Sequence, residues 1–215
     1  MGKLKLLFFL WGMFYSLLGI TASEISLKNW IGEDSSGKFK MTKVDDCLDI
    51  VSPDGLTLWY DECLTGNYEI SYRIKVVMEG GKYDRLSDMN CFWGAKDLKY
   101  PDNIYARKDW RAGIFKNYNT LNLFYVGYGG NENKTTRFRE YHSEFYGIDE
   151  NKIKPLVKEY TDEAHLLKPN RWYEVVITVT DGKTTFAVDG EEWMIMMLRL
   201  GYLYWVKWWK QQYCW

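Results

Sequence analysis

Residues 68–78 constrain the fold more strongly than any other stretch, because apolar and polar side chains alternate there without interruption. One face of this stretch would carry Tyr68, Ile70, Tyr72, Ile74, Val76 and Met78. A period of two over this length predicts a β-strand that is buried on one side. Further strand-forming segments occur at 47–51, 56–60, 87–94, 121–128, 134–141, 156–160, 172–180 and 184–188. Roughly ten short strands with scarcely a helix predict an all-β sandwich of two antiparallel sheets.

The segments between these strands are expected to be less regular. We expect an irregular lead-in at 26–37, a long polar loop at 95–109 that is a candidate binding loop or rim, and a helical turn within 144–154. Residues 110–116 are expected to form a short extended piece. At 215 residues the chain is long enough for one sizeable core, and nothing in it indicates a second domain or a repeat.

The first 23 residues have the composition of a secretory signal peptide. Lys3 and Lys5 precede an apolar run over 6–20, and small residues follow up to Ser23. An uncleaved anchor is the alternative, but the apolar run is short for spanning a bilayer. We therefore expect an exported protein, periplasmic or extracellular, with no stable membrane span and with a folded domain over 24–193.

Charge and cysteine spacing exclude several classes of partner. Without the two lysines of the leader, 26 basic residues face 29 acidic ones, a net charge of −3. Nucleic-acid binders carry a basic excess, so nucleic acid is not an expected partner. Export would permit disulfides among Cys47, Cys63, Cys91 and Cys214, for which three pairings are possible. No CxxC or Cys/His spacing typical of a zinc site occurs, so neither a metal nor another cofactor is expected.

Residues 121–142 combine two strand-like segments with a Gly/Asn-rich turn. Antiparallel pairing across this turn would set Tyr125 opposite Arg137 and would place Arg139 and Tyr141 on the same face. Two arginines and two tyrosines suit a polar, ring-shaped, anionic ligand. The alternative is an exposed sheet face with solvated arginines. A slip of one residue would exchange the two faces, so the face depends on the register.

This composition favours elimination at a uronate among the reactions on glycans. The proton next to the carboxylate is weakly acidic, so Arg, Asn, Gln or a metal must neutralise the carboxylate while Tyr, His or Lys removes the proton. The candidate substrate-binding residues are Asn90, Trp93, Arg111, Arg137 and Arg139, and the candidate bases are Tyr125, Tyr141 and His142. Several of them belong to one hairpin, which makes their proximity plausible. A non-catalytic sugar-binding face would have the same composition.

Each of these assignments competes with a structural role. His142 pairs on the apolar side of the predicted hairpin, which favours a structural histidine, and His165 is also expected to be structural. Trp93 is a candidate platform for sugar stacking, but a sandwich of this size also needs large aromatic residues in its core. Glycoside hydrolysis needs two carboxylates that flank the scissile bond. The acidic residues beside predicted turns, Asp45, Asp46, Asp49, Glu191 and Glu192, are more simply explained as solvated turn residues.

Four segments resemble a known family: GLTLWY (55–60), RLSDMNCFWGAKD (85–97), NLFYVGYGGNENKTTRFREY (122–141) and HLLKPNRWYEVVI (165–177). They resemble an uncharacterised family of exported bacterial domains that is common in gut Bacteroidetes. The resemblance implies a concanavalin-like jelly roll, similar in fold to YesU-like and 3-keto-disaccharide-hydrolase-like domains. It also implies a place beside polysaccharide-degrading enzymes. It assigns no catalytic residue, because fold alone does not fix function.

Residues 194–215 depart from the rest of the chain. They contain no Asp, Glu, Pro, Ser, Thr or Asn, and they are expected to follow neither a strand pattern nor an amphipathic period. One hypothesis is that the reading frame changes shortly after Trp193, so that this tail is not a selected sequence. The alternative is a hydrophobic segment that docks on a partner or a membrane. The coding DNA, read in the other two frames, would decide between them.

Taken together, the residues predict a secreted all-β sandwich, and the resemblance implies that it is a jelly roll that acts on polysaccharide or oligosaccharide. A lyase on uronate-containing glycans is the leading class, and a non-catalytic glycan-binding module is the alternative. The oligomeric state is left open.

Overall fold

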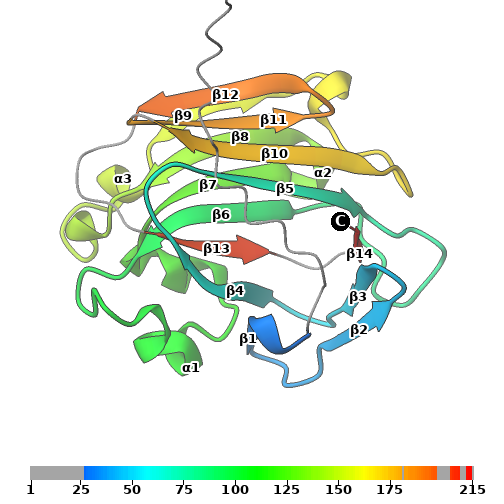
Figure 1. Ribbon diagram of the computed structural model, residues 1–215, viewed down its shortest axis with the longest axis horizontal. Helices are drawn as coiled ribbons and strands as arrows, with labels where there is room; N and C mark the ends of the chain where they lie inside the picture. The colour runs from blue at the N-terminus through cyan, green and yellow to red at the C-terminus, as the bar shows by residue number, and fades with distance from the viewer. Residues whose placement is uncertain (1–26, 181, 198–203, 209–211, 215) are drawn as a thin grey trace, which may run out of the picture.

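The computed structural model describes residues 27–180, 182–197, 204–208 and 212–214, the last two ranges by their backbone (Figure 1). The expected signal peptide lies outside the described residues. Within them, two antiparallel sheets of seven strands each pack face to face. Sheet A has the order β1 (Trp30–Asp34), β4 (Leu56–Leu64), β13 (Tyr204–Trp208), β6 (Met89–Lys96), β7 (Asn122–Gly129), β8 (Thr135–Tyr141) and β9 (Leu156–Tyr160). Sheet B has the order β12 (Glu191–Met197), β11 (Lys183–Val188), β10 (Tyr173–Thr180), β5 (Tyr68–Lys75), β14 (Gln212–Cys214), β3 (Cys47–Val51) and β2 (Lys40–Val44).

Strand β5 confirms the alternation from which the fold was predicted. Tyr68, Ile70, Tyr72 and Ile74 are buried, and the residues between them are exposed. Their side chains meet apolar residues of sheet A, so the main core lies between the two sheets. The all-β sandwich of two antiparallel sheets is therefore confirmed.

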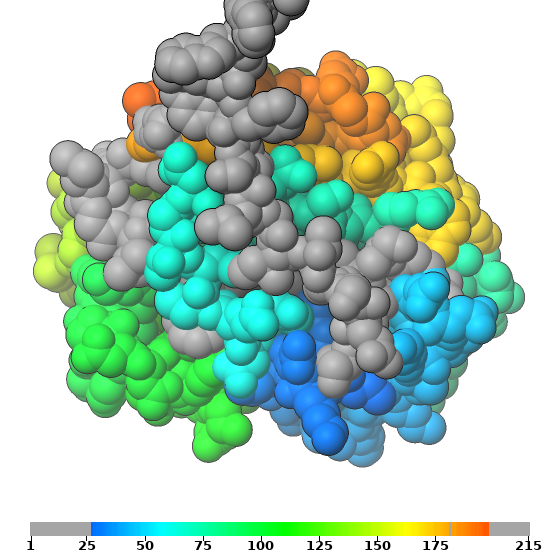
Figure 2. All heavy atoms as spheres, in the orientation of Figure 1, coloured from blue at the N-terminus to red at the C-terminus, as the bar shows by residue number. Residues whose placement is uncertain are grey.

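A second apolar cluster lies on the opposite face of sheet A. It contains Trp59, Phe92, Ala95, Ile104, Tyr118, Leu121, Leu123, Tyr125 and Tyr141. Ile104, Tyr118 and Leu121 come from segment 97–121, which crosses this face after β6. The segment is green in Figure 2, at lower left, beside the blue N-terminal strands. Sheet A is thus covered on both faces, but only in part on its outer one.

The sequence predicted segment 97–121 incompletely. It holds three short helical turns, η2 (Ile104–Arg107), α1 (Lys108–Arg111) and η3 (Phe115–Thr120). The extended piece expected at 110–116 is therefore wrong. Helix α1 ends because Ala112 and Gly113 both have positive φ, 45° and 74°. A Cβ at position 113 would lie 2.3 Å from the carbonyl oxygen of Gly55, so only glycine allows this approach of two backbones.

Other connections contain short helical turns as well. These are η1 (Leu27–Asn29), α2 (Gly130–Asn133), η4 (Ser143–Phe145), α3 (Glu150–Ile153) and η5 (Glu163–His165). Helix α3 and η4 confirm the helical turn expected within 144–154. Strand β1 lies inside the lead-in that was expected to be irregular. No helix among the described residues is both long and apolar enough to cross a membrane.

The chain after Trp193 contributes strands to both sheets. Strand β12 continues through Met197, with Met194 and Met196 buried and Ile195 and Met197 exposed. The expectation of no strand pattern is therefore wrong for residues 194–197, and the boundary set at 193 falls inside a strand. The backbone of β13 pairs with β4 and β6, and that of β14 pairs with β3 and β5. The frame-change hypothesis stays a prediction for the coding DNA to test.

The cysteines fall into two groups. Cys47 is disulfide-bonded, whereas Cys63 and Cys91 are thiols, Cys63 exposed and Cys91 buried. The backbone of Cys214 lies in register with that of Cys47 in the β14–β3 pair.

Candidate functional site

The β7–β8 hairpin has the predicted faces but a different register. Tyr125 lies opposite Arg139, not Arg137, and Tyr141 lies opposite Leu123. The turn is a left-handed one in which Asn131, Glu132 and Asn133 all have positive φ. The turn is centred one residue later than expected. Each residue of β7 therefore pairs with a residue of β8 that lies two positions further along the chain than predicted. Because side chains alternate with a period of two, a shift of two leaves each residue on its predicted face.

The four residues predicted to share a ligand face line one pocket. Tyr125, Arg137, Arg139 and Tyr141 surround a volume of about 240 Å³ on the outer face of sheet A. The remaining lining residues are Asp88, Phe115, Gly127, Gly130, Asn131, Thr135 and Lys154. We call this the tyrosine–arginine pocket. The sequence missed Lys154, Asp88 and Phe115, because they reach the pocket from separate connections that no local pattern links to the hairpin.

Aromatic rings form the floor and one wall of the tyrosine–arginine pocket. The ring centroid of Tyr125 lies 5.6 Å from that of Phe115 and 5.8 Å from that of Tyr141. A Cβ at Gly127 would lie 2.3 Å from the Tyr125 hydroxyl, so this glycine gives the tyrosine side chain room along the strand. The Tyr141 hydroxyl is buried and has no hydrogen-bond partner among the described residues. Tyr141 is 0% exposed, so this hydroxyl lies beneath the surface of the pocket.

Three cationic groups face these rings. Arg139 donates from Nη1 to the Lys154 carbonyl oxygen at 2.6 Å, and Arg137 donates from Nε to Glu159 Oε2 at 2.6 Å. The Lys154 ammonium lies 5.4 Å from the Phe115 centroid and 5.9 Å from the Tyr141 centroid. Each arginine is therefore anchored at one nitrogen, and its other N–H groups have no partner among the residues that the structure describes.

The surroundings shift the pKa values of three groups in the pocket. Burial raises the pKa of Tyr125 well above its usual value, with further increases from Tyr141 and Asp88, while the two arginines oppose it in part. Burial also raises the pKa of Tyr141, against the charge of Arg139. Burial and Arg139 lower the pKa of Lys154, and Glu150 partly offsets this. Both tyrosines are thus hydrogen-bond donors at neutral pH, and Lys154 is the group whose pKa moves toward neutrality.

Asn90 and His142 have different positions relative to the pocket. Asn90 lies opposite Gly127, which lies opposite Arg137, so all three form one row across sheet A. Asn90 Oδ1 is buried and accepts no hydrogen bond from the described residues. His142 is outside the pocket, buried between Glu140 and Glu144 at 3.9 and 3.7 Å. As a candidate base His142 is therefore wrong, since its position after Tyr141 turns it to the other face.

Trp93 is wrong as a sugar platform. It is 0% exposed and lies in the core between the sheets, where its ring packs against Phe124 and Phe186. Its Nε1 donates to Thr184 Oγ1 at 2.9 Å. Trp93 pairs with Phe124 between β6 and β7 and faces sheet B. Because side chains alternate along β6, Trp93 cannot point to the outer face of sheet A.

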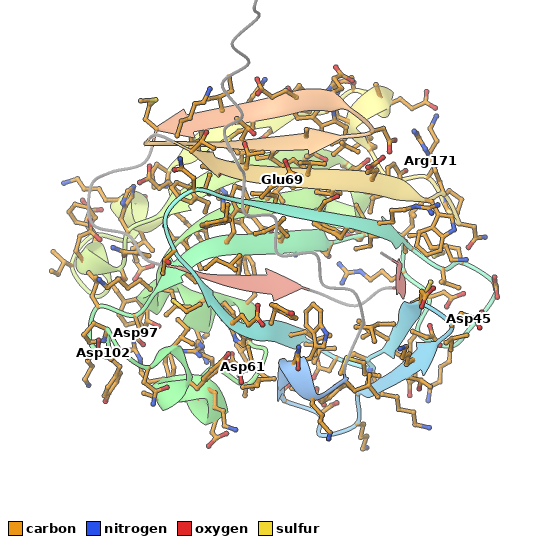
Figure 3. The ribbon with its side chains drawn as sticks, viewed as in Figure 1. Asp45, Asp61, Glu69, Asp97, Asp102 and Arg171 are labelled. Carbon is orange, nitrogen blue, oxygen red and sulfur yellow. The ribbon has the colours of Figure 1, made fainter. Side chains whose placement is uncertain are left out.

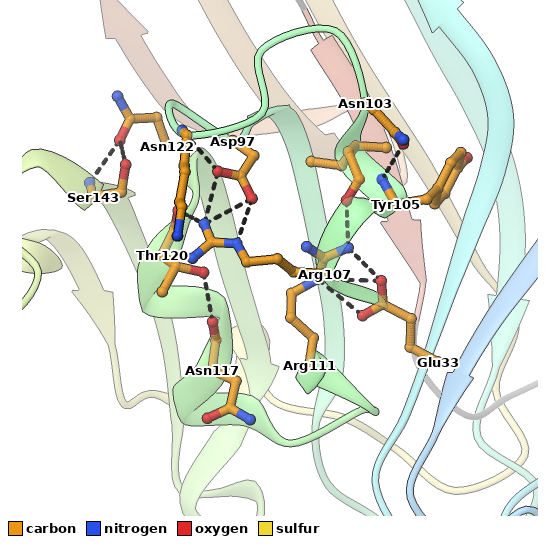
Figure 4. Close-up of polar contacts among 12 residues, drawn as sticks. Glu33, Asp97, Asn103, Tyr105, Arg107, Arg111, Asn117, Thr120, Asn122 and Ser143 are labelled. Carbon is orange, nitrogen blue, oxygen red and sulfur yellow. Dashed lines mark hydrogen bonds and ion pairs between the residues drawn. The ribbon is translucent and has the colours of Figure 1, made fainter. Parts of the chain in front are cut away.

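Arg111 is wrong as a substrate contact. It is 0% exposed and pairs with the carboxylate of Glu33 in β1, which also accepts hydrogen bonds from Trp59 and Tyr118. Its Nη2 donates to the Ile104 carbonyl oxygen at 2.6 Å. Figure 4 shows this cluster beside a second one. Sequence reasoning treated Arg111 as available because Glu33, 78 residues away, gave no signal of a pairing.

The second ion pair joins residues within the same segment. Arg107 donates from Nε and Nη2 to the two oxygens of Asp97 at 2.8 and 2.7 Å, and from Nη2 to the Thr120 carbonyl oxygen at 3.2 Å. Asp97 is 1% exposed. Arg107 thus joins the two ends of segment 97–121, and Arg111 ties its middle to β1 (Figure 4). Phe115, which follows Arg111 in this segment, lines the tyrosine–arginine pocket.

A larger groove adjoins the tyrosine–arginine pocket. It has a volume of about 830 Å³ and shares Asp88 and Phe115 with the pocket. Its other lining residues are Ser35, Ser52, Pro53, Asp54, Gly55, Lys82, Tyr83, Asp84, Arg85, Ser87, Gly113 and Ile114. We call it the outer groove. Of the acidic residues expected to be solvated, Asp45, labelled in Figure 3, Asp46, Glu191 and Glu192 are exposed and outside both sites. No group of three or more His, Cys, Asp or Glu that could hold a metal occurs within the described ranges.

Comparison with solved structures shows the same fold at low identity. A protein of unknown function with a galectin-like fold from Bacillus subtilis has a TM-score of 0.54 at 13% identity, over 87% of this chain and 86% of that one. An endo-beta-1,3-glucanase from Pyrococcus furiosus has a TM-score of 0.50 at 12% identity, over 89% and 79%. A glycoside hydrolase family 16 endo-glucanase from Bacteroides ovatus has a TM-score of 0.50 at 12% identity, over 88% and 83%. These identities establish the fold alone.

No curated protein matches the chain significantly. A family model does, over residues 50–201, which is more than half of the chain and passes the boundary at 193. The chain belongs to this family, described as a domain of unknown function (DUF6250).

Proposed function

We propose that this chain is an exported carbohydrate-active domain that binds a uronate-containing glycan in the tyrosine–arginine pocket. One observation carries the proposal: Arg137, Arg139 and Lys154 converge on a small aromatic pocket in which Asp88 is the one carboxylate among the described lining residues. The two glucanases of similar fold support a glycan as the ligand class. Their low identity leaves the choice of sugar to the residues of the pocket itself.

The pocket offers separate partners for the two parts of a uronate. A planar guanidinium binds a carboxylate through two parallel hydrogen bonds, and Arg139 is already held in place by the Lys154 carbonyl. The apolar face of a sugar ring packs on an aromatic ring, for which the partly exposed Phe115 is available. Because these groups are fixed before binding, little side-chain entropy is lost when the ligand enters.

Lys154 favours elimination as the catalytic form of this function. With its carboxylate held by Arg139 and Arg137, the uronate would lose the proton at C5 to Lys154 in its unprotonated form, whose share the lowered pKa increases. The C4–O bond would then break, a C4=C5 double bond would form, and a tyrosine hydroxyl would protonate the departing oxygen. The raised pKa values of Tyr125 and Tyr141 suit this donor role and disfavour the base role assigned to them from the sequence. A glycan-binding module without turnover is the second candidate, because binding needs only the cations and the rings.

A panel of acidic and neutral polysaccharides tests the proposal. Binding would be measured by isothermal titration calorimetry, and turnover by absorbance of the unsaturated uronate and by new reducing ends. We expect binding of uronate-containing polymers only. New unsaturated product identifies the lyase, and binding without any product identifies the binding module. Binding of neutral polymers alone, or of no polymer in the panel, would overturn the proposal.

A further inference from the structure

The outer groove is built for a different kind of sugar from the tyrosine–arginine pocket. The two sites meet at Asp88 and Phe115, so one ligand chain can occupy both. The pocket, at about 240 Å³, is below the range of roughly 300–1,000 Å³ typical of ligand sites and suits a single ring. The groove, at about 830 Å³, has room for more than one.

The charges of the two sites have opposite signs. Three cationic side chains face one carboxylate in the pocket, whereas Lys82 and Arg85 face Asp54, Asp84 and Asp88 in the groove. Arg85 and Asp88 neutralise each other, because Arg85 Nη2 lies 2.5 Å from Asp88 Oδ2, which leaves Lys82 facing Asp54 and Asp84. A second carboxylate in the groove would therefore meet like charge.

The carboxylates of the groove have fixed orientations. Asp84 Oδ2 accepts the backbone N–H groups of Glu79 and Gly81 at 2.7 and 2.8 Å, and Asp54 Oδ2 accepts the Ser35 hydroxyl at 3.2 Å. The exposed Asp54 carboxylate can accept hydrogen bonds from sugar hydroxyls, which a neutral sugar supplies in number. Tyr83 and Ile114 add exposed apolar surface, 37% and 43% exposed, on which a sugar ring can pack.

Accepting the proposed function, we propose that the ligand is a mixed glycan in which neutral sugars flank the uronate. The uronate occupies the tyrosine–arginine pocket and its neutral neighbours occupy the outer groove. A polymer of uronate alone would gain nothing from the groove, because each further carboxylate would face Asp54 and Asp84.

Calorimetry with three ligands tests this: a methyl uronoside, a trisaccharide of uronates, and a trisaccharide with one uronate flanked by neutral hexoses. We expect the mixed trisaccharide to bind about tenfold more tightly than the uronoside, and the uronate trisaccharide to show no gain. Tyr83→Ala should remove the gain of the mixed ligand and leave affinity for the uronoside unchanged. An equal gain for both trisaccharides, or no effect of Tyr83→Ala, would overturn the inference.

Two further variants separate this inference from the proposed function. Asp54→Asn keeps a side-chain oxygen that can accept hydrogen bonds in the turn, but it removes the negative charge. The uronate trisaccharide should therefore bind about 2- to 5-fold more tightly. Asp45→Asn, an exposed position outside the groove (Figure 3), is the matched control and should change nothing. Arg139→Ala should weaken all three ligands. If Arg139→Ala has no effect, the proposed pocket is wrong; if it does and the two trisaccharides still bind alike, only the inference about neutral sugars is wrong.

Discussion

Replacing Arg111 by methionine separates a structural role from a role in ligand binding. Methionine keeps most of the length of the side chain but removes the charge and its donors, so the Glu33 carboxylate remains buried with only Trp59 and Tyr118 as partners. Both side chains of the ion pair are 0% exposed, so solvent cannot replace the lost partner. Breaking such a pair by removing one member costs about 3–5 kcal/mol of the free energy of unfolding.

That loss can be converted into a melting temperature. For a chain of 150–250 residues, 1 kcal/mol shifts Tm by about 2–4 °C, so Arg111→Met should lower Tm by about 6–20 °C. Urea unfolding, followed by tryptophan fluorescence, would give the free energy directly. Adding Glu33→Gln should recover part of the loss, because a neutral amide is less costly to bury without its partner than a carboxylate.

The matched control is Lys116→Met in the same segment. Lys116 is exposed, and its replacement should change the unfolding free energy by less than about 0.5 kcal/mol. The structural account of Arg111 would be refuted if Arg111→Met kept full stability and lost affinity for acidic glycans. In that case the arginine would contact the ligand, as the sequence alone had predicted.

Three further predictions concern the pocket and the core. Arg139→Ala should weaken binding of an acidic glycan by about 10- to 150-fold, as expected for the loss of 1.5–3 kcal/mol from hydrogen bonds to a charged group, whereas the exposed Lys183→Ala should not; calorimetry would compare them. Lys154→Arg should keep binding and abolish elimination, because arginine stays protonated. In the unmodified chain, the elimination rate should rise as pH increases through the lowered pKa of Lys154 and should level off at a lower pH than for an ordinary lysine; a rate independent of pH would exclude Lys154 as the base. Trp93→Phe should reduce stability by about 1–3 kcal/mol through the lost bond to Thr184 and the cavity, with unchanged glycan affinity in the folded protein.

The sequence predicts the fold well because alternation is a local signal. Strand β5 and the faces of the β7–β8 hairpin could be predicted because odd- and even-numbered residues of a strand point to opposite faces. A register error of two residues does not change the face to which a residue points. Arg137 and Arg139 were identified in this way. The signal fails where the burial of a residue depends on a partner that is distant in the sequence. Arg111 is buried because it pairs with Glu33, and nothing near Arg111 in the sequence shows this.

The candidate site was found in part for the same reason. Residues on the hairpin share a face and could be predicted together, whereas Lys154 enters from the segment after α3 and Asp88 from the start of β6. Trp93 was misassigned because strand-like composition does not tell which face of β6 points to the core. The stretch after Trp193 was judged by its composition, but Met194 and Met196 show that apolar residues at alternate positions are enough for β12.

The positions of β13 and β14 have a consequence for when this protein can fold. Each lies inside a sheet, β13 between β4 and β6 and β14 between β5 and β3, although both come late in the chain. During synthesis, the strand that joins β4 to β6 is therefore missing until residues 204–208 have been made. The strand that joins β5 to β3 is likewise missing until residues 212–214 have been made. Pairings between such distant segments form slowly, because a long loop must close before they contribute. We expect a ribosome-bound chain that stops at residue 197 to be digested by a protease at β4 and β6, and the chain through residue 215, once released, to resist it. Neither sheet of this chain can be completed before β13 and β14 have been made.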